Sequence, residues 1–212
     1  ANAADSPRSL RDLVYATVDG KPLGLDLHMP AGDRKPLLLV YLHGGAWSAG
    51  DKSQYPAFLV DKGYAVASLD FRSTNDAPFP ANVNDIKAGI RYLRANATKH
   101  GYPADRIAVV GASSGGHLAA LVGTTNGDAR LEGREGAHLE QSSAVQAIVS
   151  YFGASNLTTI LAANFERAAE DPSAHDPALD LEHIGLSRYG AEKHDADKTV
   201  VSESINQPKL KC

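Results

Sequence analysis

Apolar residues along the chain fall into short continuous runs that are separated by polar, glycine-containing segments. Four of these runs have the length of a strand, at residues 37–42, 64–69, 107–110 and 144–149. Strands that are covered by helices on both faces of a sheet have this continuous apolar character, whereas a strand with one wet face alternates. We therefore predict four buried strands.

Helical periodicity appears between the strands. Val83, Ile86, Ile90 and Leu93 recur at spacings of three and four, which places one apolar stripe on a helix that runs to about residue 97. Residues 115–122 are small residues and leucine, typical of a helix packed closely on a sheet. Alternating strands and helices predict a three-layer α/β/α fold with a mostly parallel sheet.

Both ends of the chain differ from this pattern. Residues 13–18 and 23–29 are strand-like and flank an Asp-Gly turn at 19–20, which predicts an N-terminal antiparallel hairpin. About residues 164–198 the chain is polar without a clear strand, and we interpret this stretch as a solvated helical excursion. We treat residues 1–212 as a single domain.

Composition narrows the function classes. The 212 residues carry 21 Lys and Arg against 25 Asp and Glu, a net charge of −4, and 43% of them are hydrophobic. This share of hydrophobic residues is enough for a folded core. Nucleic acid is an unsuitable partner, because the chain has no cluster of Lys and Arg residues that could neutralise phosphates. The longest apolar run is too short for a membrane span. The single cysteine, Cys212, excludes an intrachain disulfide and a cysteine-based zinc site.

The N-terminus leaves the location of the protein open. Residues 1–5 are mostly small and lack an initial methionine. This composition suits a chain that was trimmed behind a signal peptide, and it equally suits one that was trimmed during cloning. Secreted or periplasmic and cytoplasmic locations are both compatible with the sequence.

A glycine and serine motif follows the third apolar run. Residues 111–115 are G-A-S-S-G, directly before the predicted helix. A G-x-S-x-G sequence between a buried strand and a helix is typical of a nucleophile elbow, a sharp and strained turn that larger flanking residues would obstruct. We expect Ser113 to project above the carboxyl end of its strand, where the helix N-terminus favours developing negative charge.

A second glycine motif, H-G-G-A-W at residues 43–47, follows the first run. Glycines there let backbone N–H groups turn into a pocket, as in half of an oxyanion hole. We expect Gly44 and Gly45 to donate from one side and the backbone N–H of Ser114 from the other. One such donor lowers a reaction barrier by about 3 kcal/mol. We predict that His43 braces this loop by hydrogen bonding and that Trp47 lies at the substrate pocket.

Together these motifs resemble those of a known family. With D-F-R at 70–72, P-F-P at 78–80 and G-H at 116–117, the chain resembles α/β-hydrolases of the carboxylesterase type over about residues 13–161. The nearest likeness is to the hormone-sensitive-lipase-like and feruloyl- or acetyl-esterase-like branch. The resemblance implies hydrolysis of short-chain or aromatic carboxylic esters through an acyl-serine intermediate, without cofactor or metal. It implies Ser113 as the nucleophile and Gly44, Gly45 and Ser114 as the oxyanion donors.

The C-terminal part departs from the family's pattern. Such enzymes take an acid and a histidine from beyond two further parallel strands, in the order serine, acid, histidine. Residues 198–212 contain no run suited to a buried strand, and no histidine follows His194. We therefore expect the last two strands and the triad partners of Ser113 to be missing, which would leave a weak nucleophile and a residual rate.

The histidines that are present are poor substitutes for this base. His117 lies on the helix face of Ser113 but points down the helix, and the others lie in polar segments: His138, His175, His183 and His194. Acidic residues beside His175 and His194 lack a ligand spacing typical of a metal, so we predict no metal site.

Two alternatives of other classes stay open. Residues 111–116 also resemble the phosphate turn of short-chain dehydrogenases, and Tyr189 and Lys193 form a Y-x-x-x-K pair. That turn should, however, follow the first strand of its domain and carry a different glycine spacing. A chain that keeps the pocket and loses the triad would also suit a non-catalytic, hydrolase-like binding module.

Loss of the last strands would also affect association. The run at 144–149 would then lie at or near an edge of the sheet, and an exposed apolar edge invites pairing with another chain. We expect this edge to cause formation of a homodimer or aggregation. The other expected partner is a small-molecule ester, the substrate.

Overall fold

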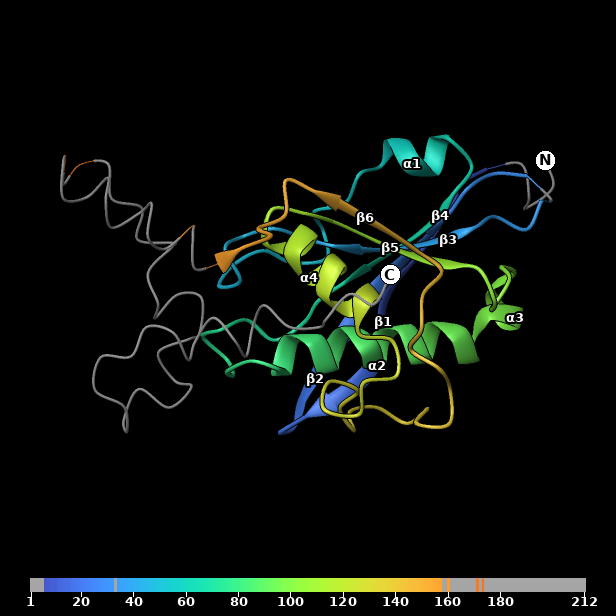
Figure 1. Cartoon of the computed structure of the whole chain (residues 1–212). Coiled ribbons are helices and arrows are strands. Elements are labelled where there is room, and N and C mark those ends of the chain that lie inside the picture. Colours follow the sequence, from blue (N-terminus) through green and yellow to red (C-terminus); the bar gives the residue numbers. More distant parts are fainter. Residues whose placement is uncertain (1–5, 33, 158–159, 161–170, 172, 174–212) are drawn as a thin grey trace.

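The computed structural model describes residues 6–32, 34–157, 160, 171 and 173. These residues form one mixed sheet of six strands in the order β1-β2-β4-β3-β5-β6, with helices on both faces (Figure 1). The predicted three-layer α/β/α fold is confirmed. The strands are β1 (Arg8–Val18), β2 (Lys21–Met29), β3 (Leu38–Leu42), β4 (Ala65–Leu69), β5 (Ile107–Ala112) and β6 (Ala147–Tyr151).

The sheet combines an antiparallel start with a parallel remainder. β1 pairs with β2 and β2 with β4 in antiparallel register, whereas the β4–β3, β3–β5 and β5–β6 pairs are parallel. The predicted hairpin is confirmed, but β1 begins at Arg8 rather than at residue 13. The first half of β1 is largely exposed, so no apolar run marks it in the sequence.

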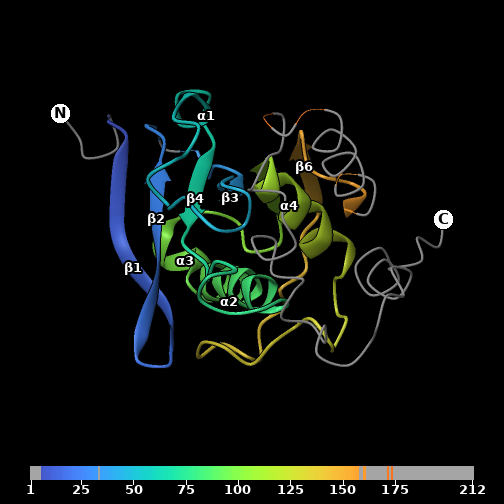
Figure 2. The same cartoon turned by 90° about the vertical axis from the view of Figure 1, so that its left-hand side faces the viewer.

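Among the helices of the described residues, one short helix covers one face of the sheet and three cover the other (Figures 1 and 2). The first is α1 (Phe58–Asp61), and the others are α2 (Ala81–Ala95), α3 (Ala97–His100) and α4 (Ser114–Thr124). The predicted apolar stripe of α2 is confirmed, since all four of its side chains are fully buried. The short helices α1 and α3 have too few residues to show a period, and the pattern did not predict them.

β6 lies at an edge of the described sheet, as the sequence predicts, but it is shifted along the chain. It runs over Ala147–Tyr151 rather than 144–149, and all five of its residues are exposed. The prediction of a buried strand is therefore wrong here, because an edge strand of the described sheet has a neighbouring strand on one side only. Just before it, the side-chain oxygen of Gln146 accepts a hydrogen bond from the N–H of Ile107 at 2.9 Å. Arg94 of α2 donates to the carbonyl oxygens of Ser142 and Ala144. The backbone N–H of Gln146 also donates to the carbonyl oxygen of Ile107 at 2.9 Å, so pairing with β5 begins at residue 146, whereas the carbonyl groups of residues 142 and 144 are held by Arg94.

Other predictions concern segments that are not described. Apart from Asp171 and Ser173, the polar stretch at 164–198 lies outside the described residues, as does 198–212. That residues 1–212 form one domain stays a prediction. Among the described helices, none combines the length and the apolar character that a membrane span requires.

Candidate active site

Ser113 sits on the sharp turn between β5 and α4. Its backbone has φ 56° and ψ −125°, the strained strand-to-helix turn that the sequence predicts. A non-glycine residue in such a region costs about 1–3 kcal/mol and persists only where the surrounding structure holds it. The serine is exposed and stands at the N-terminus of α4, which favours negative charge. The side chain is therefore accessible to a ligand.

Two glycines make this turn possible. A Cβ atom on Gly111 would lie 2.1 Å from the carbonyl oxygen of Gly115. A Cβ atom on Gly115 would lie 2.2 Å from the carbonyl oxygen of Leu42, at the end of β3. These distances are far shorter than van der Waals contact, so only glycine fits at either position.

The end of β6 supports the same turn. The backbone N–H of Ser113 donates to the carbonyl oxygen of Tyr151 at 2.8 Å. Just beyond, a Cβ atom on Gly153 would lie 2.7 Å from the carbonyl carbon of Gly116. Because the N–H of Ser113 is occupied, Ser114 is the candidate oxyanion donor of the elbow. It is the first residue of α4, where an N–H has no partner within the helix.

The glycine loop after β3 lies beside the nucleophile. β3 and β5 are parallel neighbours, and their last pair is Leu42 with Gly111, so the loop and the elbow leave the sheet at the same point. A Cβ atom on Gly44 would lie 3.3 Å from the Cβ of Ser113 and 3.9 Å from its Oγ. Gly45 has φ 117°. Sheet register thus brings together the two motifs that the sequence predicts to cooperate.

His43 braces this loop, as predicted. Its Nδ1 lies 2.7 Å from the carbonyl oxygen of Gly44, and its ring stacks on Phe71 with centroids 4.4 Å apart. Phe71 follows β4, where Asp70 also accepts a hydrogen bond from the N–H of Lys52 at 2.7 Å. Burial is the main cause that raises the pKa of the Asp70 carboxyl. Sequence reasoning missed the support from Phe71, because a stacking partner leaves no spacing signal.

Trp47 is buried, with 8% of its surface exposed, and its indole N–H donates to Nδ1 of His117 at 3.1 Å. Its place at the substrate pocket stays a prediction. The bond occupies one ring nitrogen of His117, and burial lowers the pKa of that imidazole to about 4. His117 is therefore poorly suited to act as a base at neutral pH.

No hydrogen bond joins the side chain of a described histidine to the side chain of Ser113; His117 meets Ser113 only through its backbone N–H, which donates to the Ser113 carbonyl oxygen at 3.1 Å at the start of α4. Their side chains have other neighbours: hydrogen bonds join His28 to Ser9, His43 to Gly44 and His117 to Trp47, Nδ1 of His138 lies 3.7 Å from a carboxylate oxygen of Glu140, and His100 stacks on Tyr102. The remaining three, His175, His183 and His194, lie outside the described residues. Within the described ranges no three His, Cys, Asp or Glu side chains are grouped as metal ligands.

Curated relatives of the chain are esterases. Esterase LipQ of Mycobacterium tuberculosis (strain ATCC 25618 / H37Rv) is 33% identical over 133 residues, which is 60% of this chain and 31% of that protein. Ethyl acetate hydrolase of Pseudomonas putida is 33% identical over 129 residues, 58% of this chain and 41% of that protein. The chain thus spans less than half the length of these two relatives.

Solved structures that resemble the chain include a carbohydrate esterase. A bifunctional GH43-CE protein of Bacteroides eggerthii matches with a TM-score of 0.64 and 36% identity, over 82% of this chain and 25% of that one. A truncated carbohydrate esterase from gut microbiota matches with a TM-score of 0.62 and 32% identity, over 72% of this chain and 59% of that one.

The BD-FAE family model matches residues 25–181, more than half of the chain and including both glycine motifs. This match and the esterase relatives set aside the short-chain dehydrogenase alternative. The curated relatives of the chain named above are esterases, and the chain itself belongs to the BD-FAE family of α/β-hydrolase-like proteins.

Proposed function

We propose that the protein is a serine carboxylesterase that cleaves short-chain or aromatic carboxylic esters through an acyl-serine intermediate. The observation that carries the proposal is the meeting of the two motifs. Ser113, exposed and strained, stands at the N-terminus of α4, and a Cβ atom on Gly44 would lie 3.9 Å from its Oγ. A nucleophile beside backbone donors is the arrangement that acyl transfer requires.

Each residue has a defined part in the proposed reaction. Oγ of Ser113 forms a bond to the ester carbonyl carbon, and the carbonyl π electrons move onto its oxygen. That oxyanion accepts hydrogen bonds from the N–H groups of Gly44, Gly45 and Ser114. When the carbonyl re-forms, the bond to the alcohol oxygen breaks, and the alcohol leaves with the proton taken from Ser113. Water then forms a bond to the acyl carbon, the bond from that carbon to Oγ of Ser113 breaks, Oγ takes up a proton from the water, and the carboxylic acid leaves.

A base has to take the proton from Ser113 and pass it to the leaving alcohol. His117 is occupied by Trp47, and the other described histidines contact other groups. The proposed mechanism therefore needs a base from outside the described residues. Without one, oxyanion stabilisation and binding would support only a residual rate.

The relatives also bear on the substrate. One is named an ethyl acetate hydrolase, and another is a carbohydrate esterase. Both names fit the proposed class, in which a small acyl group is removed from an alcohol. We therefore propose a short acyl group as the first choice of test substrate.

A fluorophosphonate probe tests the proposed function. We expect intact-mass analysis to show one adduct and peptide mapping to place it on Ser113, together with hydrolysis of p-nitrophenyl acetate above the rate in buffer. Heat-unfolded protein is the control for non-specific labelling. Absence of both adduct and hydrolysis would instead support the non-catalytic binding module.

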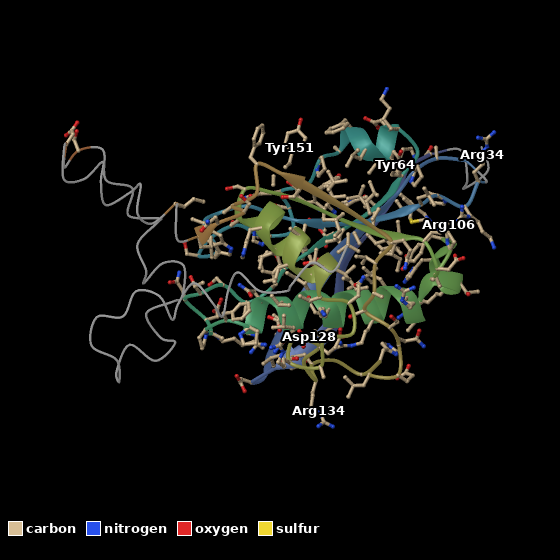
Figure 3. All side chains as sticks on the ribbon, in the orientation of Figure 1. Arg34, Tyr64, Arg106, Asp128, Arg134 and Tyr151 are labelled. Carbon is tan, nitrogen blue, oxygen red and sulfur yellow. The ribbon has the colours of Figure 1, made fainter. Side chains whose placement is uncertain are left out.

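We also propose that this chain pairs with a second copy through β6. The strand is an edge of the described sheet, with Val149 45% and Tyr151 61% exposed. Figure 3 shows the side chain of Tyr151 pointing away from α4. An exposed apolar edge is a template for pairing with another chain.

Sedimentation velocity should therefore give a dimer of the 22.4 kDa chain or larger species. Val149→Lys places a charge on this edge and should shift the population to monomer. Val14→Lys is the matched control, because Val14 is 51% exposed on β1 at the opposite edge. A wild-type chain that sediments as a single monomer would contradict this proposal.

A further inference from the structure

A side-chain hydrogen bond joins the two halves of the candidate active site. Trp47 belongs to the glycine loop after β3, and His117 belongs to α4, the helix that Ser113 begins. The indole N–H donates to Nδ1 of His117 at 3.1 Å, and the rings meet edge to face with centroids 5.5 Å apart at 80°. Burial of Trp47 shields this bond from competing water.

The loop that carries Trp47 is strained. Ala46 has φ 50° and Trp47 has φ 62°, so two consecutive non-glycine residues lie in the left-handed region. Residues held in this way cost free energy and persist only where other contacts fix them. Such strain has to be offset by contacts of the loop with the rest of the protein. One of the two strained residues, Trp47, makes such a contact with α4 through its side chain.

The backbone hydrogen bonds of Gly45 and Trp47 do not join the loop to α4. The carbonyl oxygen of Gly45 accepts from the N–H groups of Ser48 and Ala49 at 3.0 Å each, within the loop. That of Trp47 accepts from the N–H of Thr74, beyond β4, at 2.9 Å. These bonds fix the shape of the loop and its link to the next segment, whereas the indole bond fixes it to the helix of the nucleophile.

The state of His117 suits this task. Burial lowers the pKa of the imidazole to about 4, and no charged group is among the causes. The ring is therefore neutral at neutral pH and keeps a lone pair on Nδ1 for the indole N–H. Protonation would place a hydrogen on that nitrogen and remove the acceptor.

We propose that Trp47 and His117 are positioning residues that hold the glycine loop against α4, so that the N–H groups of Gly44 and Gly45 stay in place for the oxyanion formed at Ser113. This inference rests on the proposed function for its catalytic consequence. The holding of the loop itself can be measured without any activity.

Variants of His117 separate positioning from general stability. His117→Leu removes the acceptor, whereas His117→Asn offers a side-chain oxygen in its place. Thr124→Ala is the matched control, because Thr124 is an exposed residue of the same helix. Amide hydrogen exchange of residues 43–50, followed by mass spectrometry, should rise in the Leu variant and return toward wild type in the Asn variant. Unchanged exchange in the Leu variant would overturn the proposal.

The single tryptophan of the chain gives a second readout. Its fluorescence should change with a midpoint near pH 4 as His117 is protonated, and this step should vanish in both His117 variants while Thr124→Ala keeps it. A step that survives in the variants would contradict the bond. Circular dichroism at each pH shows whether the fold is intact.

Kinetics test the catalytic consequence. In the Leu variant we expect kcat for p-nitrophenyl acetate to fall on the order of 10-fold with little change in KM, and partial rescue by Asn. A fall in kcat without rescue by Asn would contradict positioning through the hydrogen bond. If wild-type protein neither hydrolyses the ester nor takes up a fluorophosphonate, the proposed function fails, while hydrogen exchange still decides whether the pair holds the loop.

Discussion

Replacement of Ser113 by alanine is expected to remove nearly all hydrolysis of p-nitrophenyl acetate and to leave only the residual rate that binding and the oxyanion donors support. Loss of the nucleophile in a serine hydrolase reduces kcat on the order of 10⁴-fold or more, because the remaining donors stabilise an oxyanion that no longer forms by attack of the enzyme. The same variant should take up no fluorophosphonate. Initial rates at saturating ester and intact-mass analysis measure the two effects.

Ser142→Ala is the control for this experiment. Ser142 is an exposed serine in the segment before β6, and its removal should leave rate and labelling unchanged. The Ser113 variant should unfold at nearly the wild-type urea concentration, because the exposed hydroxyl contributes little to packing. Hydrolysis that persists in the Ser113 variant would show that another group performs the reaction.

Replacement of Gly115 by alanine is expected to have the largest effect on stability. The new Cβ would lie 2.2 Å from the carbonyl oxygen of Leu42 and 2.4 Å from that of His43. Both are backbone atoms, so neither can rotate away, and the end of β3 has to separate from the elbow. We expect a loss of about 3 kcal/mol in the free energy of unfolding, at the upper end of ordinary overpacking. Ser113 should also lose its reactivity.

Gly24→Ala is the matched control for this variant. At Gly24 the nearest atom to the new Cβ is Cε of Lys52, 3.6 Å away on a flexible side chain. Its unfolding free energy should stay within about 0.5 kcal/mol of wild type. Urea unfolding followed by circular dichroism gives both values. Equal midpoints for the Gly115 variant and wild type would contradict the close crossing of backbone at the elbow.

Much of the fold was predictable because the signals are local. The α2 stripe repeats at the helical period, and continuous apolar runs mark the parallel strands. The boundaries of β6 were not predictable, because Gln146 and Arg94 anchor the segment before it through long-range hydrogen bonds. Those bonds join residues far apart in the chain and have no period.

The candidate site divides in the same way. The sequence by itself determined the strand-turn-helix elbow at Ser113 and the glycine loop at 43–47, since glycine is required wherever a side chain would collide with neighbouring backbone. Only the tertiary structure decided that the carbonyl oxygen of Tyr151 accepts a hydrogen bond from the N–H of Ser113, and that the indole N–H of Trp47 donates to His117. Such pairings depend on which strands are neighbours and in which register, and the β3–β5 register is set by the packing of the whole sheet.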